Sequence, residues 1–198
     1  MQSRREEKRG KNLKLRNAKR IDFTGTCPEF DFFEKFSDAT IDLIRNKEKA
    51  EVVIVVDRAY GFAASHLKDN APESHLISDH LNLTGDSPLV GPNNPIGERF
   101  PVVNNIYLSA ADTIDQEETW TMGNPLSKLR SGIVAGVKYG AVPSPAELDL
   151  LYSVGAHFYN WNTVPTMIIA AHAGLKVLAL AVPEGGVLPD QVLMAINR

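Results

Sequence analysis

The order of apolar and polar residues predicts a chain of short strands and helices. Residues 52–56, VVIVV, are all β-branched, and such a continuous run is typical of a strand buried on both faces of a parallel sheet. Four more segments are expected to be strands: residues 75–78, 133–137, 158–161 and 176–182. Residues 81–101 contain three Gly and four Pro, which predicts a long loop.

Helical spacing first appears in residues 29–45. Their apolar side chains recur at intervals of three and four, which places one face of a helix on Phe33, Phe36, Thr40 and Ile44. Residues 106–114 have no clear period, and either a helix or a loop is compatible with them.

A second helix carries its own start and stop signals. Residues 144–147, SPAE, form a capping box with proline at the first helical position. The expected buried stripe is Leu148, Leu151 and Val154, and Gly155 stands where a left-handed stop belongs.

A third helix is expected to be capped by Thr163, to run to about residue 173 and to end at Gly174. Strands that alternate with helices predict an α/β fold with parallel strands.

The composition of the 198 residues favours one globular domain, since 43% are apolar and 23% are charged. Charge is distributed unevenly along the chain. Residues 1–20 contain nine Lys or Arg against two Glu, a net charge of +7, whereas residues 21–198 carry 12 basic and 22 acidic side chains, a net charge of -10. We expect a basic, mobile tail over residues 1–20 and a single domain over 21–198. The tail either stays solvated, contacts an acidic partner or nucleic acid, or packs on the domain.

Compartment and cofactor signals are sparse. Cys27 is the single cysteine, which suits a reducing compartment, and the N-terminus lacks an apolar signal region, so a cytoplasmic location is expected. A mitochondrial presequence is the weaker alternative, because Glu6 and Glu7 oppose it. No apolar run approaches the roughly 18 residues of a membrane helix, and no metal or dinucleotide motif occurs, so neither a membrane nor a cofactor is predicted.

Two ordered segments carry a resemblance to a known family. Residues 78–101 contain Asp-His-Leu-Asn-Leu, Ser-Pro-Leu-Val-Gly-Pro-Asn and Arg-Phe-Pro. Residues 145–177 retain Ala-Glu, Gly-Ala, Thr-Val-Pro and His-Ala-Gly-Leu-Lys-Val. Both segments resemble the trimeric purine nucleoside phosphorylases, and the resemblance spans roughly residues 50–185.

The resemblance implies an α/β fold whose mixed, largely parallel twisted sheet is flanked by helices. It also implies reversible phosphorolysis, in which a purine nucleoside and phosphate give a free base and ribose 1-phosphate. Phosphate would be the co-substrate, and the protein would form a homo-oligomer, a trimer in the family. The family's Phe that matches Phe100 reaches into a neighbouring subunit.

Several positions depart from the family's pattern. The glycine-rich phosphate loop is absent, and the phosphate-binding Ser is matched by Asn162. The Met that packs on ribose is matched by Trp161. The purine-recognising Glu and Asn fall near Pro143 and Gly185, which offer no polar side-chain atom. No catalytic residue is therefore carried over.

Five residues remain candidates for a site. Substrate binding is assigned to Tyr60, Phe100, Trp161, Asn162 and Glu184, and Asn162 is also the candidate phosphate ligand. The favoured interpretation is a phosphorylase-like protein with impaired or lost phosphorolysis that acts by purine or nucleoside binding or as an assembly subunit.

Two alternatives stay open. The first is an active phosphorylase with a divergent site, whose polar groups would be Tyr60, His80, Asn162 and Glu184. The second is a shortened version of a longer enzyme. Shortening would explain the missing glycine-rich loop, but it would not explain the changes inside the matched region.

Overall fold

The computed structural model describes residues 15, 18–22, 24, 51–91, 97–113 and 123–197. Cys27, the helix expected over 29–45 and most of the basic tail lie outside the described residues. Within them, no helix is both long enough and apolar enough to cross a membrane.

Six strands form one mixed sheet, in the order β1-β2-β8-β5-β6-β7. All neighbours are parallel except β8 and β5, which are antiparallel over three residue pairs. The bounds are Lys19–Asp22 (β1), Val52–Ala59 (β2), His75–Leu83 (β5), Arg130–Val137 (β6), Phe158–Asn160 (β7) and Lys176–Pro183 (β8). The short strands Leu67–Lys68 (β3) and Ala71–Pro72 (β4) form a separate hairpin. The predicted fold class, a mixed and largely parallel α/β sheet, is confirmed.

The sheet curls until its last strand returns to β2. Tyr60, directly after β2, and Tyr159, on β7, donate their backbone N–H groups to each other's carbonyls at 3.0 Å. Ala63 N donates to His157 O at 2.8 Å beside this bridge. The bridge closes the sheet on itself and brings the ends of β2 and β7 together, although β8, β5 and β6 separate them in the sheet order.

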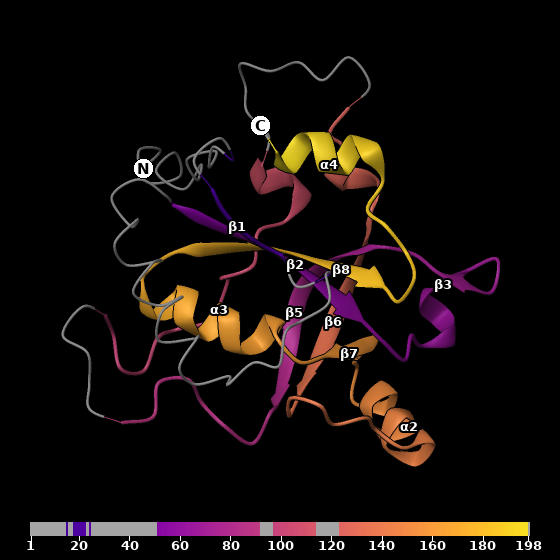
Figure 1. Ribbon diagram of the computed structural model, residues 1–198, viewed down its shortest axis with the longest axis horizontal. Helices are drawn as coiled ribbons and strands as arrows, with labels where there is room; N and C mark the ends of the chain where they lie inside the picture. The colour runs from indigo at the N-terminus through magenta and orange to yellow at the C-terminus, as the bar shows by residue number, and fades with distance from the viewer. Residues whose placement is uncertain are drawn as a thin grey trace, which may run out of the picture.

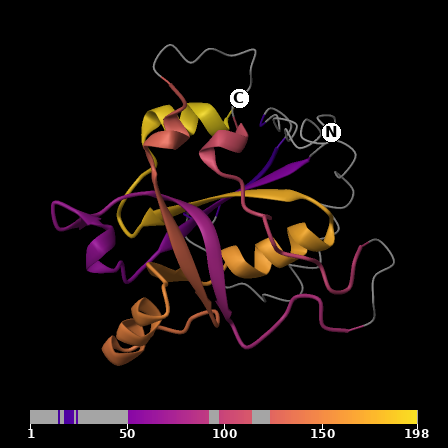
Figure 2. The same ribbon diagram turned by 180° about the vertical axis from the view of Figure 1, so that it is seen from behind.

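Helices cover the two faces of β2 and β8, as both ribbon views show (Figures 1 and 2). On one face, α3 (Thr163–His172) packs against the residues of β2 and β8 that include Val53, Val55 and Val177. On the other face, α4 (Asp190–Ile196) packs with Ile54, Leu178 and Leu180. Both faces of these central strands are buried, as the unbroken β-branched run predicts.

The remaining helical segments are short or peripheral. The helix α2 (Pro145–Ser153) covers the β6–β7 end of the sheet through Leu151. Three 3-10 turns connect the strands: η2 (Ala64–His66), η3 (Ala110–Thr113) and η4 (Pro125–Lys128). η3 is the only regular helix between residues 106 and 113, so the undecided segment is mostly extended or looped in its described part.

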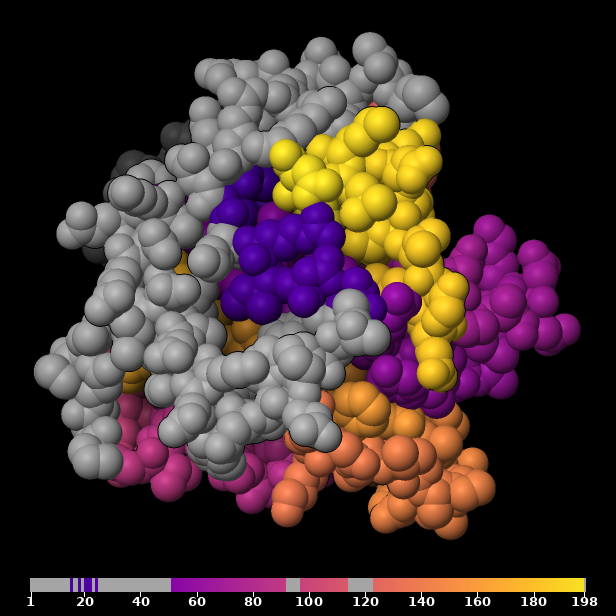
Figure 3. Space-filling view, viewed as in Figure 1, coloured from indigo at the N-terminus to yellow at the C-terminus, as the bar shows by residue number. Residues whose placement is uncertain are grey.

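The strand β1 lies at the molecular surface beside α4 (Figure 3). Its Arg20 guanidinium donates to the Asn197 side chain at the end of α4 and to Asp22 Oδ2. Leu15 and Ala18 pack on the α4 side of the sheet. The last residues of the segment expected to be a mobile tail therefore belong to the folded sheet.

Most predicted elements are confirmed, but β2 extends three residues beyond the predicted run 52–56, and β6 starts three residues before the predicted run 133–137. Four further corrections concern β5, β7 and the helices. β5 continues to Leu83 because its parallel pairing with β6 runs to the end of both strands, so the long loop starts three residues later than residue 81. β7 ends one residue before Trp161. Val154 is 55% exposed rather than buried, because the helix stops at Ser153 and Val154 is already its C-cap. Thr163 is the first residue of α3 rather than its cap.

The capping box and the helix stops agree with the sequence. The Ser144 side chain accepts from Glu147 N, and Glu147 Oε2 accepts from Ser144 N. Gly155 and Gly174 adopt φ of 100° and 73°, where a side chain would be strained.

Helix α3 sits so close to β6 that it requires a glycine there. An ideal Cβ on Gly136 would lie 2.5 Å from Val164 Cγ2, well inside van der Waals contact. Adding a methyl group to a packed core typically costs about 1–3 kcal/mol.

We therefore expect Gly136→Ala to lower the free energy of unfolding by about 1–3 kcal/mol in urea denaturation. In a Val164→Gly background, which removes Cβ at 2.7 Å together with both methyl groups, the same substitution should cost clearly less. An equal cost in both backgrounds would show that this contact does not set the spacing between α3 and β6.

Candidate functional site

Three candidate residues follow directly after strands whose ends meet. Ala59 and Pro183, the last residues of β2 and β8, are paired in register, so Tyr60 and Glu184 emerge side by side. Trp161 follows β7, and the Tyr60–Tyr159 bridge brings β7 to the same place. Ligand sites in open α/β sheets usually form beyond the carboxyl ends of strands. The curled sheet thus makes one candidate site from three strand ends.

Aromatic rings form the partly solvent-exposed side of this site. The ring centroid of Tyr60 lies 5.0 Å from that of Trp161 and 5.7 Å from that of Tyr159. Tyr139, 39% exposed, packs edge-on against Trp161 with its centroid at 5.9 Å. Trp161 Nε1 donates to Ala141 O at 2.8 Å, which holds the indole in place. Tilted rings at these separations are mutually favourable, so they form a stable apolar edge.

A buried carboxylate lies behind the rings. Asp57, near the end of β2, is fully buried and accepts four hydrogen bonds from the start of α3. Its Oδ2 accepts from Asn162 N at 3.2 Å, from Thr163 N at 3.1 Å and from Thr163 Oγ1 at 3.2 Å. Its Oδ1 accepts from Asn162 Nδ2 at 3.1 Å. Asn162, the N-cap of α3, supplies no side-chain cap of its own, so Asp57 caps this helix from another strand.

The cluster is polar and buried, and most of its side-chain polar atoms form hydrogen bonds. Asn160 Nδ2 donates to Thr163 Oγ1 at 2.7 Å, which leaves the Thr163 hydroxyl proton for Asp57. Asn160 Oδ1 is buried without a partner. Burial raises the pKa of the Asp57 carboxyl to about 6, although the hydrogen bonds from Asn162 and Thr163 lower it. Desolvation disfavours the charged form and wins over the four bonds.

The guanidinium of Arg58, the residue after Asp57, is already engaged with the backbone. Arg58 Nη1 donates to Pro183 O at 2.9 Å and Gly186 O at 2.7 Å, and its Nε donates to Thr24 O at 3.2 Å. The guanidinium thus connects Thr24, two residues after β1, to the end of β8 and the turn that follows it. Acids therefore dominate the electrostatics near Tyr60: desolvation first, then Glu184 and Asp57, raise the pKa of its hydroxyl, against a smaller opposing effect of Arg58.

The structure brings four of the five predicted residues together. Tyr60, Trp161 and Glu184 stand at the strand ends, and Asn162 follows Trp161 with its amide on Asp57. Phe100 lies elsewhere, 85% exposed, with the Arg99 guanidinium 5.8 Å from its ring centroid. His80, named for a divergent site, lies on β5 and packs edge-on against Tyr107. The binding roles of all these candidate residues stay predictions.

Sequence reasoning missed Asp57. The available signal was a charged pair, Asp57-Arg58, directly after a β-branched run. Nothing in the local pattern indicated that this carboxylate reaches a helix more than 100 residues later in the chain.

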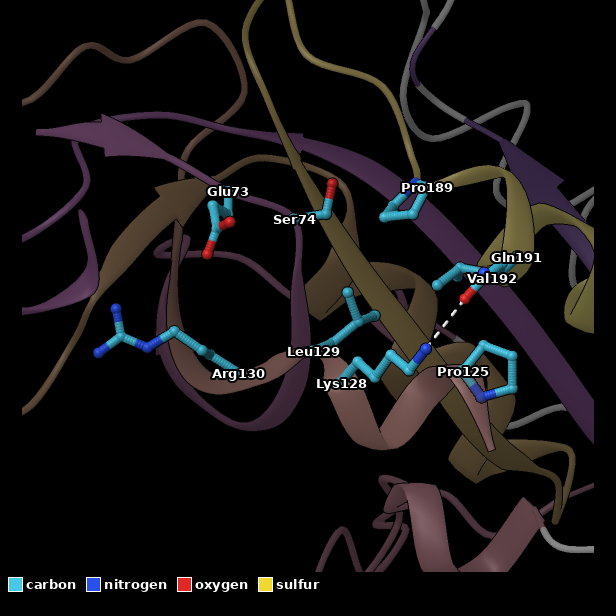
Figure 4. A pocket seen from close by; sticks show the side chains of 9 residues that line it. All are labelled: Glu73, Ser74, Pro125, Lys128, Leu129, Arg130, Pro189, Gln191 and Val192. Carbon is cyan, nitrogen blue, oxygen red and sulfur yellow. Dashed lines mark hydrogen bonds between the residues drawn. The ribbon is translucent and has the colours of Figure 1, made fainter. Parts of the chain in front are cut away.

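A cavity of about 150 Å³ lies away from this site, between η4, the start of β6 and the start of α4 (Figure 4). Its charged side chains are already engaged. Lys128 Nζ donates to Gln191 Oε1 at 3.1 Å, Glu73 pairs with Lys68 at 3.2 Å, and the Arg130 guanidinium donates to backbone carbonyls. We assign this cavity no ligand.

Three histidine side chains also lie together, but their ring nitrogens form hydrogen bonds with one another and with the backbone. His66 Nδ1 lies 3.1 Å from His75 Nε2, and His75 Nδ1 lies 2.8 Å from Glu73 O. His157 Nδ1 accepts from Ile133 N at 2.8 Å, and its ring stacks on His66. Within residues 51–91, 97–113 and 123–197 and the few described residues before them, no three His, Cys, Asp or Glu side chains are placed to hold a metal ion.

Comparisons with known proteins agree on one family. No family model matches the chain. Purine nucleoside phosphorylase 1 of Bacillus subtilis is 30% identical over 156 residues, covering 77% of this chain and 55% of that protein. Purine nucleoside phosphorylase of Mus musculus is 35% identical over 123 residues, covering 58% and 41%. The chain thus spans about half the length of the curated relatives it matches.

Solved structures show the same fold. A Schistosoma purine nucleoside phosphorylase in complex with hypoxanthine superposes with a TM-score of 0.65 at 19% identity, covering 84% of this chain and 76% of that one. Isoform 2 from Schistosoma mansoni, in complex with cytosine and ribose-1-phosphate, gives a TM-score of 0.62 at 24% identity, covering 86% and 64%.

Asp57 should give the protein a distinct pH dependence of stability. Because its pKa rises from 3.8 to about 6 on folding, the folded state binds this proton more tightly than the unfolded chain. The resulting stabilisation is complete below pH 3.8 and is lost as the pH rises through 6. Asp57→Asn keeps the size and one of the two acceptor oxygens, and it does not titrate.

We expect the free energy of unfolding of the wild type to fall relative to that of Asp57→Asn by on the order of 3 kcal/mol between pH 4 and pH 7. Chemical denaturation across this range measures the difference. Both proteins contain the same histidines, so their titration cancels. Parallel pH curves would contradict an ionised, desolvated Asp57.

Proposed function

The chain belongs to the purine nucleoside phosphorylase family, and we propose that it binds purine bases or nucleosides without catalysing phosphorolysis. The observation that carries this proposal is the position of Asp57. Phosphorolysis needs an anionic nucleophile, and phosphate is normally held by oriented N–H and hydroxyl donors, often at the start of a helix.

At the start of α3 those donors already hold an anion. The backbone N–H groups of Asn162 and Thr163, the Asn162 amide and the Thr163 hydroxyl all point to the Asp57 carboxylate. Asn162 is also the residue that matches the family's phosphate-binding Ser. A phosphate ion there would have to displace an internal carboxylate or lie against its negative charge.

The aromatic side of the site supports a purine ligand. Tyr60 and Trp161 are only partly buried and stand beside each other at the strand ends. Flat rings of this size offer faces on which a heterocyclic base stacks. An active phosphorylase with a divergent site is the alternative, and it would require Asn162 to bind phosphate in competition with Asp57.

A second role, as a subunit of an assembly, is supported by the 97–102 segment. Phe100 and Val102 are 85% and 79% exposed, although large apolar side chains are usually covered. His172, in the last turn of α3, holds this segment through a 2.8 Å bond to Glu98 O. The segment is thus fixed to the fold while its aromatic side chain points outward, which suits a contact with another copy.

We expect inosine or guanosine with phosphate to yield no free base at an ordinary enzymatic rate. A purine base or nucleoside should nevertheless raise the melting temperature, since a ligand at 100 times its Kd stabilises by about 2.7 kcal/mol. Trp161→Ala should lose this shift and Trp161→Phe should keep most of it. Turnover at an enzymatic rate would contradict the proposal, and so would the lack of any shift.

A separate variant tests whether Asp57 prevents phosphate from binding. Asp57→Ser removes the charge and shortens the side chain, so inorganic phosphate should raise the melting temperature of this variant and leave that of the wild type unchanged. An equal response of both proteins would show that Asp57 does not block phosphate.

Phe100→Ala should shift the protein toward smaller species in sedimentation velocity, because it removes the largest exposed apolar side chain of the 97–102 segment. Val187→Ala is the matched control, since Val187 is 81% exposed on the loop before α4. An unchanged distribution for Phe100→Ala, or the same change in the control, would argue against assembly through this segment.

A further inference from the structure

We propose that the strand-end site selects purine rings that carry a positive charge, protonated or alkylated on a ring nitrogen, over neutral or phosphorylated purines. This inference rests on the proposed function and specifies the ligand of the same site. It follows from the kind of side chains that the curled sheet brings together: three aromatic rings, one exposed acid and one buried acid.

The rings supply the first part of the selection. The faces of Tyr and Trp rings are electron-rich and attract a cation within about 6 Å of the ring centroid. Tyr60 and Trp161 have centroids 5.0 Å apart and an interplanar angle of 35°, and both are partly open to solvent. Tyr159 supports Tyr60 from behind, with its own ring almost fully buried. The rings are too close to admit a ligand between them, so a planar cation would stack on the solvent-exposed side of this pair, against one electron-rich face.

Two carboxylates supply the second part. Glu184 is exposed and directly follows the residue paired with Ala59, so it stands next to Tyr60. Asp57 lies buried behind the rings. Both acids act on the ring hydroxyls: Glu184 contributes, after desolvation, to the raised pKa of Tyr60 and Tyr159, and Asp57 contributes to that of Tyr60. These two carboxylates therefore favour a positive charge at the aromatic edge.

Among the described residues, the guanidinium whose charge acts on Tyr60 is that of Arg58, and it is already engaged. Its Nε and Nη1 atoms donate to the backbone carbonyls of Thr24, Pro183 and Gly186. A ligand phosphate would meet Asp57 and Glu184, and this guanidinium would not be free to pair with it. A cationic base would meet attractive groups on both its face and its edge.

Two isomeric nucleosides of equal size allow the effect of ligand charge on binding to be measured alone. 1-Methyladenosine carries a positive charge at pH 7, whereas N6-methyladenosine is neutral and contains the same atoms. Titration calorimetry on the full chain, at low and at physiological salt, gives the Kd of each, with adenosine and adenosine 5'-monophosphate as references. We expect the cation to bind about tenfold more tightly than its isomer, and the monophosphate more weakly than adenosine.

Glu184→Gln tests the cause. It should reduce the ratio between the two isomers several-fold while leaving the Kd of N6-methyladenosine nearly unchanged. Glu51→Gln is the matched control, because Glu51 is also an exposed acid but directly precedes β2, whereas Tyr60 directly follows it, about 30 Å further along the strand. That variant should keep the wild-type ratio.

The outcomes distinguish this inference from the function on which it rests. Equal binding of the two isomers, or a ratio that Glu184→Gln does not change, overturns charge selection and leaves purine binding in place. If no purine or nucleoside binds at all, both proposals fail.

Discussion

The carboxylate of Asp57 is the contact on which the arrangement of this protein depends. It lies on the central strand β2 and caps α3, a helix more than 100 residues later in the chain, with four hydrogen bonds. Removing one partner from such a buried network leaves unpaired polar groups, which is costly. The same bonds fix where Trp161 and Asn162 leave β7, so the candidate site is positioned by this interaction.

Closure of the sheet explains why the site has its present composition. The Tyr60–Tyr159 bridge brings the end of β7 onto the end of β2, beside the end of β8. Three strand ends then contribute two aromatic residues and one acid to one small area. The absence of a side chain at Gly136 allows Val164 of α3 to pack closely against β6.

A buried carboxylate with a raised pKa is costly to keep ionised, and proteins rarely bury one without a partner of opposite charge. Here the partners are neutral donors and the start of a helix, whose dipole favours an anion. The arrangement stabilises the helix and occupies donors that would otherwise suit phosphate. Structure and proposed function thus follow from the same four bonds.

The sequence by itself determined the elements. The β-branched run of β2, the capping box of α2 and the glycine stops after α2 and α3 are local signals, and each was confirmed. The motifs over residues 78–101 and 145–177 were enough to indicate the family. The ends of strands were harder to predict where pairing with a neighbouring strand sets them. At Leu83, for example, pairing with β6 extends β5.

Which side chains meet depends on the tertiary structure. Tyr60, Trp161 and Glu184 lie far apart in the chain, and their proximity depends on strand order and on the curl of the sheet. Phe100 lies apart from them on the surface, and its role in substrate binding stays a prediction. Asp57 was not singled out, because a carboxylate's partner is set by long-range packing rather than by its neighbours in sequence. Local sequence patterns determine the hydrogen bonds within one helix or strand, whereas the residues of a site come from several elements that tertiary packing brings together.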